Sequence, residues 1–345
     1  MSALKRWFVP TRVDELPAGG KMLAYLLLGF WSLVVLFPLY WMAITSFKLP
    51  VDVSAGPLYI PFVDFKPHLD AWHYIFVDLG PDTLRPYMNS LIVASCGTAA
   101  AVFLGSMAAY ALARIEYRPP VAAVGLSVVL IALLIAAVGW GQVDLRIALA
   151  VAFALFFLLL RPIVRRARKH MNNDDILFWV ISQRILPPVV TVIPIYLMFK
   201  SAGLLDTHLA LIITYATANL PIVVWLMFDF FDGVPREIEE SAQIDGATRF
   251  AILFGIVLPL VAPGLVATAL LVLILSWNEY LFALFLSTAN AQTMPLLVAA
   301  QNATRGPQWW NMSVLILIMI LPVMLLTLTL QRFIVRGILV GAVKG

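Results

Sequence analysis

The chain has 345 residues, of which 62% are hydrophobic and 12% are charged, and its formal net charge is +4. Soluble globular domains carry about 25% charged residues, so this chain, with a mean hydropathy of +0.94, has too few polar side chains to cover its surface in water. A large soluble α/β enzyme is therefore excluded, because it would need charged helix faces between its apolar segments. The composition predicts an all-α, polytopic bundle of transmembrane helices.

The first apolar stretch begins near Met22, after a short leader at residues 1–21. It is too long for the hydrophobic region of a signal peptide, so it is predicted to be a retained span. Apolar runs of about 20 residues, the length that crosses a bilayer as a helix, recur along the chain. They predict eight spans, at 22–45, 88–113, 121–141, 146–164, 176–199, 208–230, 258–286 and 312–334.

The lysines and arginines between these spans indicate the side of the membrane that each connection occupies. With the N-terminus inside, 16 of the 23 basic residues fall in cytoplasmic segments and 6 in outer segments, while Arg184 falls within a span. This bias predicts that both termini are cytoplasmic. It also requires an even number of spans, so the pair at 121–164 crosses the membrane twice or not at all.

Two predicted outer segments are long enough to have structure of their own. Residues 47–87 contain six prolines, and residues 287–311 include Trp309 and Trp310, which suit anchoring at the membrane interface. The sequence shows no internal repeat and no soluble domain. Residues 22–345 are therefore predicted to form a single integral-membrane domain.

Histidine and cysteine usage predicts no metal site. Of the four histidines, only His68 and His73 lie near each other, and no carboxylate cluster accompanies them. The single cysteine, Cys96, can form no intrachain disulfide, so cysteine usage does not indicate whether the protein lies in an oxidising or a reducing compartment.

The predicted cytoplasmic segment 234–259 has the pattern of two short helices joined by a sharp bend. Pro235 favours a helix start, and the three glutamates that follow place negative charge at the positive end of the helix dipole. Gly246 can adopt the left-handed conformation that ends a helix, and Thr248 can cap the next one. Pro259 is expected to break that second helix where the following span begins. A rigid projection of this kind on a membrane protein is expected to serve a partner.

This segment resembles the signature of bacterial ABC importer permeases, in which Glu-Ala-Ala is followed by three residues, Gly, nine residues and Ile-x-Leu-Pro. The corresponding residues here are Glu240, Ser241, Ala242, Gly246, Ile256, Leu258 and Pro259. Only Ser241 departs from the pattern, as a residue of similar size to alanine. The resemblance implies that these residues form the coupling helix that docks on a cytoplasmic ATPase. An ordinary amphipathic surface helix is the alternative interpretation.

Further segments resemble the MalG type of carbohydrate permease: Pro187 to Tyr196, Pro221 to Phe231, Ser276 to Glu279 and Gln331 to Gly345. The resemblance implies the type I importer permease fold, with six core spans and an extra hairpin at about 121–164. It also implies a second, homologous permease, an ATPase pair that binds ATP and Mg²⁺, and an extracytoplasmic binding protein that contacts 287–311. The tail at 337–345 is expected to approach the ATPases. No cofactor is expected in this chain.

Four polar or aromatic residues inside the predicted spans are candidates for the substrate path. Arg184 lies in a span, where a charge is costly unless it is paired or hydrated, and it either faces the path, snorkels to the headgroups or pairs with a carboxylate. Trp277, Asn278 and Glu279 offer an aromatic face, an amide and a carboxylate, which suit a sugar. Helix packing and an interfacial carboxylate are the alternative.

These features predict the permease subunit of an ATP-binding-cassette importer in the bacterial inner membrane, which moves a sugar, oligosaccharide or polyol. The chain has no Gly-x4-Gly-Lys-Ser/Thr phosphate loop, so it is not expected to hydrolyse nucleotide itself. The alternative is an ion-coupled secondary transporter, which would favour paired acidic or histidine residues deep in its spans. A membrane-embedded transferase would need a catalytic constellation that the sequence lacks. The exact solute, the role of the hairpin and the subunit that holds the substrate stay open.

Overall fold

In the computed structural model, residues 17–167, 169–302 and 306–342 are described, with 332–342 as backbone only. The described residues form helices and no strand, and two isolated β-bridges occur. The chain divides into two compact units. The N-terminal unit contains residues up to 80 with 298–318, and the core unit contains 81–297 and the residues from 319 onward.

The N-terminal unit contains α2 (Ala18–Thr45), α3 (Pro50–Ser54), α4 (Asp70–His73), the π-helix η1 (Tyr74–Asp78) and the start of α17. The connection after α2 is organised around Lys48, whose side chain is buried. Its Nζ donates to the Leu58 carbonyl at 2.6 Å and lies 4.4 Å from the ring centroid of Trp41. Burial lowers the pKa of Lys48, although Asp52 and Asp64 act in the opposite direction.

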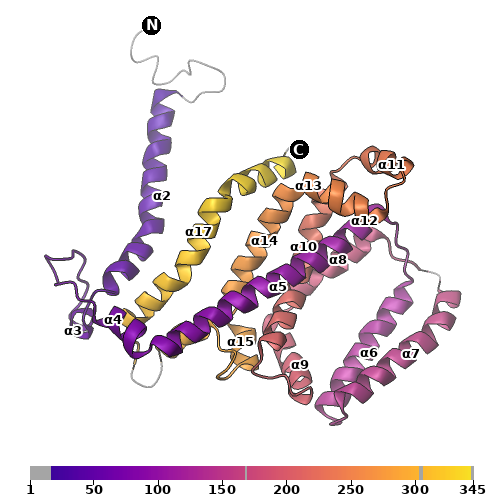
Figure 1. Ribbon diagram of the computed structural model, residues 1–345, viewed down its shortest axis with the longest axis horizontal. Helices are drawn as coiled ribbons and strands as arrows, with labels where there is room; N and C mark the ends of the chain where they lie inside the picture. The colour runs from indigo at the N-terminus through magenta and orange to yellow at the C-terminus, as the bar shows by residue number, and fades with distance from the viewer. Residues whose placement is uncertain (1–16, 168, 303–305, 343–345) are drawn as a thin grey trace, which may run out of the picture. The chain divides into compact units, whose positions relative to one another are not determined.

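The core unit contains most of the helices (Figure 1). In chain order they are α5 (Gly80–Arg114), α6 (Val121–Gly139), α7 (Leu145–Arg166), α8 (Asn173–Ser182), the 3₁₀ helix η2 (Gln183–Ile185), α9 (Pro188–Ser201), α10 (His208–Asp232), α11 (Arg236–Ile244), α12 (Arg249–Ile252), the π-helix η3 (Leu253–Val257), α13 (Leu258–Leu260), α14 (Ala262–Trp277), α15 (Leu281–Leu286), α16 (Met294–Ala300) and α17 (Trp309–Ala342). The last two extend into the N-terminal unit.

Helices long and apolar enough to cross a membrane occur at six of the eight predicted positions, and the other two positions hold pairs of helices that reach this length only together. Six are single helices, namely α2, α5, α6, α7, α10 and α17, and two are pairs of helices joined at a sharp bend. The pair Asn173–Ile185 and Pro188–Ser201 bends by 90°, and the pair Arg249–Leu260 and Ala262–Trp277 bends by 81°. The first bend lies where Pro187 and Pro188 allow a kink in the predicted span at 176–199, and the second follows Pro259 by two residues.

The prolines at 187 and 188 explain the first bend. Pro187 disfavours helical backbone in the residue before it, so η2 stops and α9 restarts at Pro188. The predicted span at 258–286 was too long, because α14 ends at Trp277 and a separate α15 begins at Leu281. In contrast, α5 starts at Gly80, eight residues before the predicted start, and contains Pro86.

Small residues allow the helices of the core unit to pack closely. A Cβ atom on Gly105 of α5 would lie 2.6 Å from Cγ1 of Val223 on α10, and one on Gly264 of α14 would lie 2.4 Å from the Phe230 ring. Such close backbone approach is typical of helix packing in membranes. The main hydrophobic core is formed by α5, α10, α12 and η3, with smaller contributions from α8 and α14.

The predicted extra hairpin is present as α6 and α7, which pack on each other. Its base is closed by backbone hydrogen bonds from Val121 to Lys169 at 3.1 Å and from Met171 to Pro119 at 2.9 Å. Leu134 and Val138 of α6 lie in a hydrophobic cluster with Met198 of α9. The hairpin is thus attached to the second half of the 90° bend.

Candidate functional site

The segment 234–259 forms the predicted elbow. Helix α11 ends at Ile244, and Gly246 then adopts a φ of +84°, the left-handed conformation that glycine accepts without strain. The Ala247 amide donates to the Ala242 carbonyl at 3.0 Å, which closes the turn. The Thr248 side chain caps α12 by accepting from the Ala251 amide at 3.3 Å. The helix, the glycine turn and the cap are confirmed.

The predicted helix break is present but lies at Val261, two residues after Pro259. The helix that begins at Arg249 runs through Pro259 to Leu260 and bends only afterwards. The π-helix η3 precedes the proline, and the Leu258 amide bonds to the Leu253 carbonyl, five residues back. Pro259 has no amide hydrogen to donate, so it is tolerated at the start of the new turn, α13.

The predicted coupling residues divide into an exposed and a packed set. Glu240, Ser241 and Gly246 are exposed, whereas Ala242 is half-buried and packs against the main core. Ile256 and Leu258, which belong to η3 and α13, are also half-buried. The sequence analysis missed Ile244, a large apolar side chain at the end of α11 that is 87% exposed. Ile244 follows Glu240 by four positions and Ser241 by three on α11, so it lies on the same exposed side of the helix.

A buried ion pair holds the elbow to the membrane bundle. Glu239 of α11 is only 4% exposed. Its carboxylate accepts from Nε of Arg114 at 2.6 Å and from the hydroxyl of Tyr110 at 2.6 Å, both on α5. Arg114 also donates to the Val234 carbonyl at 2.9 Å, and Arg236 donates to the Ala113 carbonyl at 3.2 Å. These contacts fix α11 to the end of α5.

Sequence reasoning overlooked this anchor, although two signals pointed to it. Glu239 and Glu240 are adjacent on a short amphipathic helix. Because adjacent side chains point in different directions, one of the two turns away from the exposed face. Arg114 lies at the cytoplasmic end of a predicted span. It is therefore available as the cationic partner that a buried glutamate requires. A single sequence cannot show which of the two glutamates turns inward.

At the 90° bend, Arg184 joins a polar cluster on three helices. Its Nη2 lies 3.3 Å from Oδ1 of Asn219 on α10, and the Asn219 amide donates to the Ser276 hydroxyl on α14 at 3.1 Å. Asn219 and Ser276 are buried, while Arg184 is exposed. Asn219 was missed as a candidate, although an amide in an otherwise apolar span was the available signal.

The three other path candidates occupy the break between α14 and α15. Trp277 is buried, with its Nε1 donating to the Met319 carbonyl at 3.0 Å and its ring edge-on to Tyr87 at 5.9 Å. In this conformation Trp277 is a packing residue, because protein encloses its ring. Asn278 is exposed and bonds to its own helix. The Glu279 carboxylate accepts from the Phe282 amide at 3.1 Å and so caps α15.

A carboxylate on the opposite side of the core unit from the elbow organises the predicted outer loop. Asp206, between α9 and α10, accepts from the backbone amides of Thr288, Ala289, Asn290 and Ala291 at 2.9–3.2 Å. Burial raises the pKa of Asp206, but these amide donors outweigh it and hold the pKa well below its ordinary value. The ionised carboxylate therefore stabilises the fold of the loop.

Replacing Asp206 with alanine is expected to destabilise the protein by about 2–3 kcal/mol, because four amides lose a charged acceptor. The pKa is lowered in the folded protein, so this contribution is full above the unfolded pKa of about 3.9 and is lost only in stronger acid. Thermal unfolding at pH 7 and pH 5 should show the same loss for the variant. As a control, Asp64→Ala removes a carboxylate that caps only two amides on the N-terminal unit, and should cost less.

Comparison with known proteins places these features in a family. Residues 174–340 match the model of the binding-protein-dependent transport system inner membrane component. The chain is 30% identical over 318 residues to the trehalose/maltose transport system permease protein MalG of Thermococcus litoralis, covering 91% of this chain and 93% of that protein. It is 28% identical to the diacetylchitobiose uptake system permease protein DasC of Streptomyces coelicolor over 320 residues, covering 90% and 92%.

A solved structure has the same fold. It is the crystal structure of a bacterial ABC transporter involved in the import of the acidic polysaccharide alginate, and it matches 96% of this chain and 98% of its own with a TM-score of 0.62. At 19% identity the similarity concerns the fold alone.

Proposed function

The chain belongs to the family of inner-membrane components of binding-protein-dependent transport systems, and from this premise we propose that it couples ATP hydrolysis by a partner to the uptake of a carbohydrate. It is a permease subunit of an ATP-binding-cassette importer. The single observation that carries the coupling proposal is the elbow at 234–259, whose exposed face is backed by the buried Glu239–Arg114 pair.

The proposed partners follow from the surfaces of the chain and from its family. The exposed residues Glu240, Ser241, Ile244 and Gly246 form the docking face for a cytoplasmic ATPase, which holds ATP and Mg²⁺ and performs the hydrolysis. A second, homologous permease completes the pathway, and an extracytoplasmic binding protein delivers the solute at the outer segments, including 287–311. The distribution of lysine and arginine supports cytoplasmic termini.

The proposed cargo is a sugar, oligosaccharide or polyol. The relatives that support it are named for trehalose and maltose and for diacetylchitobiose, all of which are carbohydrates. Arg184 and Asn278 are exposed and provide donors and acceptors of the kind that sugar hydroxyls require, and Asn219 holds the Arg184 side chain from the buried side. The choice between mono- and oligosaccharides depends on the partner permease and the binding protein.

The proposed mechanism is mechanical. ATPase closure pushes on α11, and the ion pair with Arg114 passes the displacement to α5 because the two side chains are buried and in contact. The two bent helix pairs lie beside α10, with α8 and α14 packed on it. Their bends are positions at which half-helices can change angle without breaking a long hydrogen-bond ladder. Alternation between inward-open and outward-open states then moves the solute.

The proposal is tested by isolating the tagged chain from its own cells and identifying the proteins that accompany it. The complex is then placed in proteoliposomes with its binding protein, and uptake of radiolabelled maltose, trehalose and chitobiose is measured with and without ATP. We expect ATP-dependent uptake of at least one carbohydrate. Uptake driven by an ion gradient in the absence of ATP would instead establish the secondary-transporter alternative.

Arg184→Gln is expected to reduce carbohydrate uptake about tenfold or more while leaving complex assembly intact. The glutamine keeps a donor but removes the charge beside Asn219. A matched control is Arg85→Gln, which removes an exposed arginine that bonds to Asn290 on the predicted outer side. Uptake kinetics decide the role, because a path residue changes the apparent affinity or the rate for different sugars unequally, whereas a purely structural residue lowers the amount of complex.

A further inference from the structure

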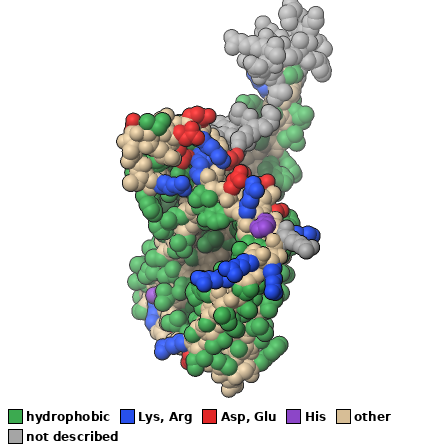
Figure 2. All heavy atoms as spheres, turned by 90° about the vertical axis from the view of Figure 1, so that its right-hand side faces the viewer, with side chains coloured by type: hydrophobic (Ala, Val, Ile, Leu, Met, Phe, Trp, Pro, Cys, Tyr) green, Lys and Arg blue, Asp and Glu red, His purple; other side chains and the backbone are tan. Residues whose placement is uncertain are grey.

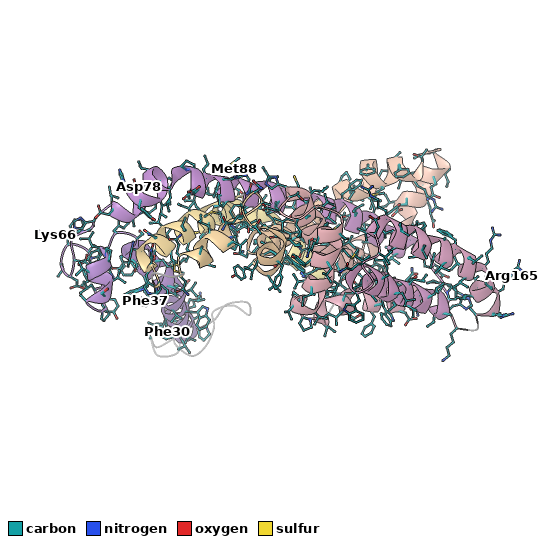
Figure 3. The ribbon with its side chains drawn as sticks, turned by 90° about the horizontal axis from the view of Figure 1, so that it is seen from below. Phe30, Phe37, Lys66, Asp78, Met88 and Arg165 are labelled. Carbon is teal, nitrogen blue, oxygen red and sulfur yellow. The ribbon has the colours of Figure 1, made fainter. Side chains whose placement is uncertain are left out.

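The hairpin carries a group of basic side chains that the proposed transport mechanism does not use. Arg161, Arg165 and Arg166 lie at the end of α7, and Lys169 follows in the connection to α8; all four are exposed. Figure 2 shows Lys and Arg side chains gathered on this face, with hydrophobic side chains below them. Figure 3 shows Arg165 at the outer edge of the core unit, at the base of the hairpin.

These four charges are not neutralised within the part of the chain that the structure describes. None of the four side chains makes an ion pair or a hydrogen bond there. Of the acidic side chains on adjacent segments, Glu116 pairs with Arg118 and Asp175 caps α8, while the exposed Asp174 of α8 makes no ion pair with any of the four. Compensation of the α7 helix dipole accounts for one or two cations at a helix end, but it does not account for a cluster of four.

The length of α7 places the cluster at the depth of lipid headgroups. Arg146 and Arg161 are 15 positions apart, which is about 22 Å along a helix, and extended arginine side chains bring both charges to the edges of a hydrocarbon core about 30 Å thick. Trp140, in the turn at the opposite end of the hairpin, is 89% exposed, as suits the other membrane interface.

The surface beside the cations is apolar. Phe153, Phe157 and Leu158 of α7 are 56–71% exposed. A soluble acidic protein would match the cations but leave these side chains uncovered, whereas a phospholipid offers a phosphate for the arginines and acyl chains for the apolar face. Arginine binds phosphate with two parallel hydrogen bonds, which makes it well suited to this contact.

We propose that the end of the hairpin, formed by Arg161, Arg165, Arg166 and Lys169, is a binding site for anionic phospholipid headgroups. The proposal rests on the cytoplasmic orientation of this end given under the proposed function. Because α6 packs against α9 through Leu134 and Val138, the bound lipid also fixes the position of the second half of the 90° bend. The position of α9 then depends on the lipid composition of the inner leaflet.

The test measures lipid binding to the purified full chain, independently of transport. The chain is placed in nanodiscs of phosphatidylcholine with 0–30% phosphatidylglycerol, and enrichment of the anionic lipid around it is measured by native mass spectrometry after extraction. We expect several-fold enrichment for the natural chain. In the variant R161Q/R165Q/R166Q/K169Q the enrichment should fall to the bulk ratio, because each cation near an anionic surface contributes about fivefold to the affinity.

A matched control neutralises Arg146 and Lys200, two exposed cations at the predicted outer side, and is expected to retain the enrichment. Equal enrichment in the fourfold variant, or equal loss in the control, would overturn the proposal. Millimolar inorganic phosphate in the buffer should not displace the lipid, since the acyl chains contribute to binding. Failure of carbohydrate uptake in the reconstituted complex would contradict the proposed function and leave this lipid measurement unaffected.

Discussion

Replacing Gly246 with aspartate is expected to abolish carbohydrate uptake and to prevent stable association with the ATPase, while membrane insertion stays normal. Gly246 has a φ of +84°, and a Cβ atom there meets nothing within 4 Å. The substitution therefore causes no clash inside the chain. It adds backbone strain of about 1–2 kcal/mol, and it places bulk and negative charge on the face that is proposed to enter the ATPase. We expect uptake to fall by tenfold or more.

The measurement compares uptake and co-purified ATPase for the variant with those for Gly203→Asp. Gly203 is also at positive φ, +67°, and also has open space around it, but it lies between α9 and α10, away from the elbow. The control therefore carries a similar backbone strain without altering the docking face. If Gly246→Asp transports at the natural rate, the coupling assignment is wrong; if both variants fail, strain and not docking explains the loss.

Replacing Glu239 with alanine is expected to uncouple the elbow from the bundle. Arg114 would keep its buried guanidinium without a carboxylate, and breaking a buried pair in this way costs about 3–5 kcal/mol. Tyr110 would also lose its acceptor. We expect a lower unfolding temperature and a loss of uptake that exceeds any loss of ATPase association, because the docking face itself is retained.

The double variant Glu239→Leu with Arg114→Met separates charge from packing. Removing both members of a buried ion pair is often nearly neutral for stability, so the unfolding temperature should recover. The control Glu237→Ala removes an exposed carboxylate on the same helix. It should change the free energy of unfolding by no more than about 0.5 kcal/mol and should leave uptake unchanged. Unchanged uptake in Glu239→Ala would show that the ion pair transmits no force.

The positions of the apolar helices follow from local composition, which is why the sequence located the six single helices of spanning length and the two bent pairs. A run of about 20 apolar residues is stable only in lipid, whatever its neighbours are. The elbow was predicted for a similar reason. Gly246 and Thr248 act on backbone within a few residues of themselves, so the local sequence is sufficient to predict the turn and the cap.

The angles of the bends and the buried partners were decided by tertiary structure. The chain is apolar on both sides of the 81° bend, so hydropathy does not indicate the bend. The π-helix before Pro259 allowed the helix to continue through this proline to Leu260. The inward turn of Glu239, instead of Glu240, depends on Arg114 and Tyr110, more than 120 positions earlier in the chain. Likewise, Asn219 joins Arg184 to Ser276 only because three helices converge. Periodicity and composition report a residue's own surroundings along the chain, while these contacts form between distant segments once the helices pack.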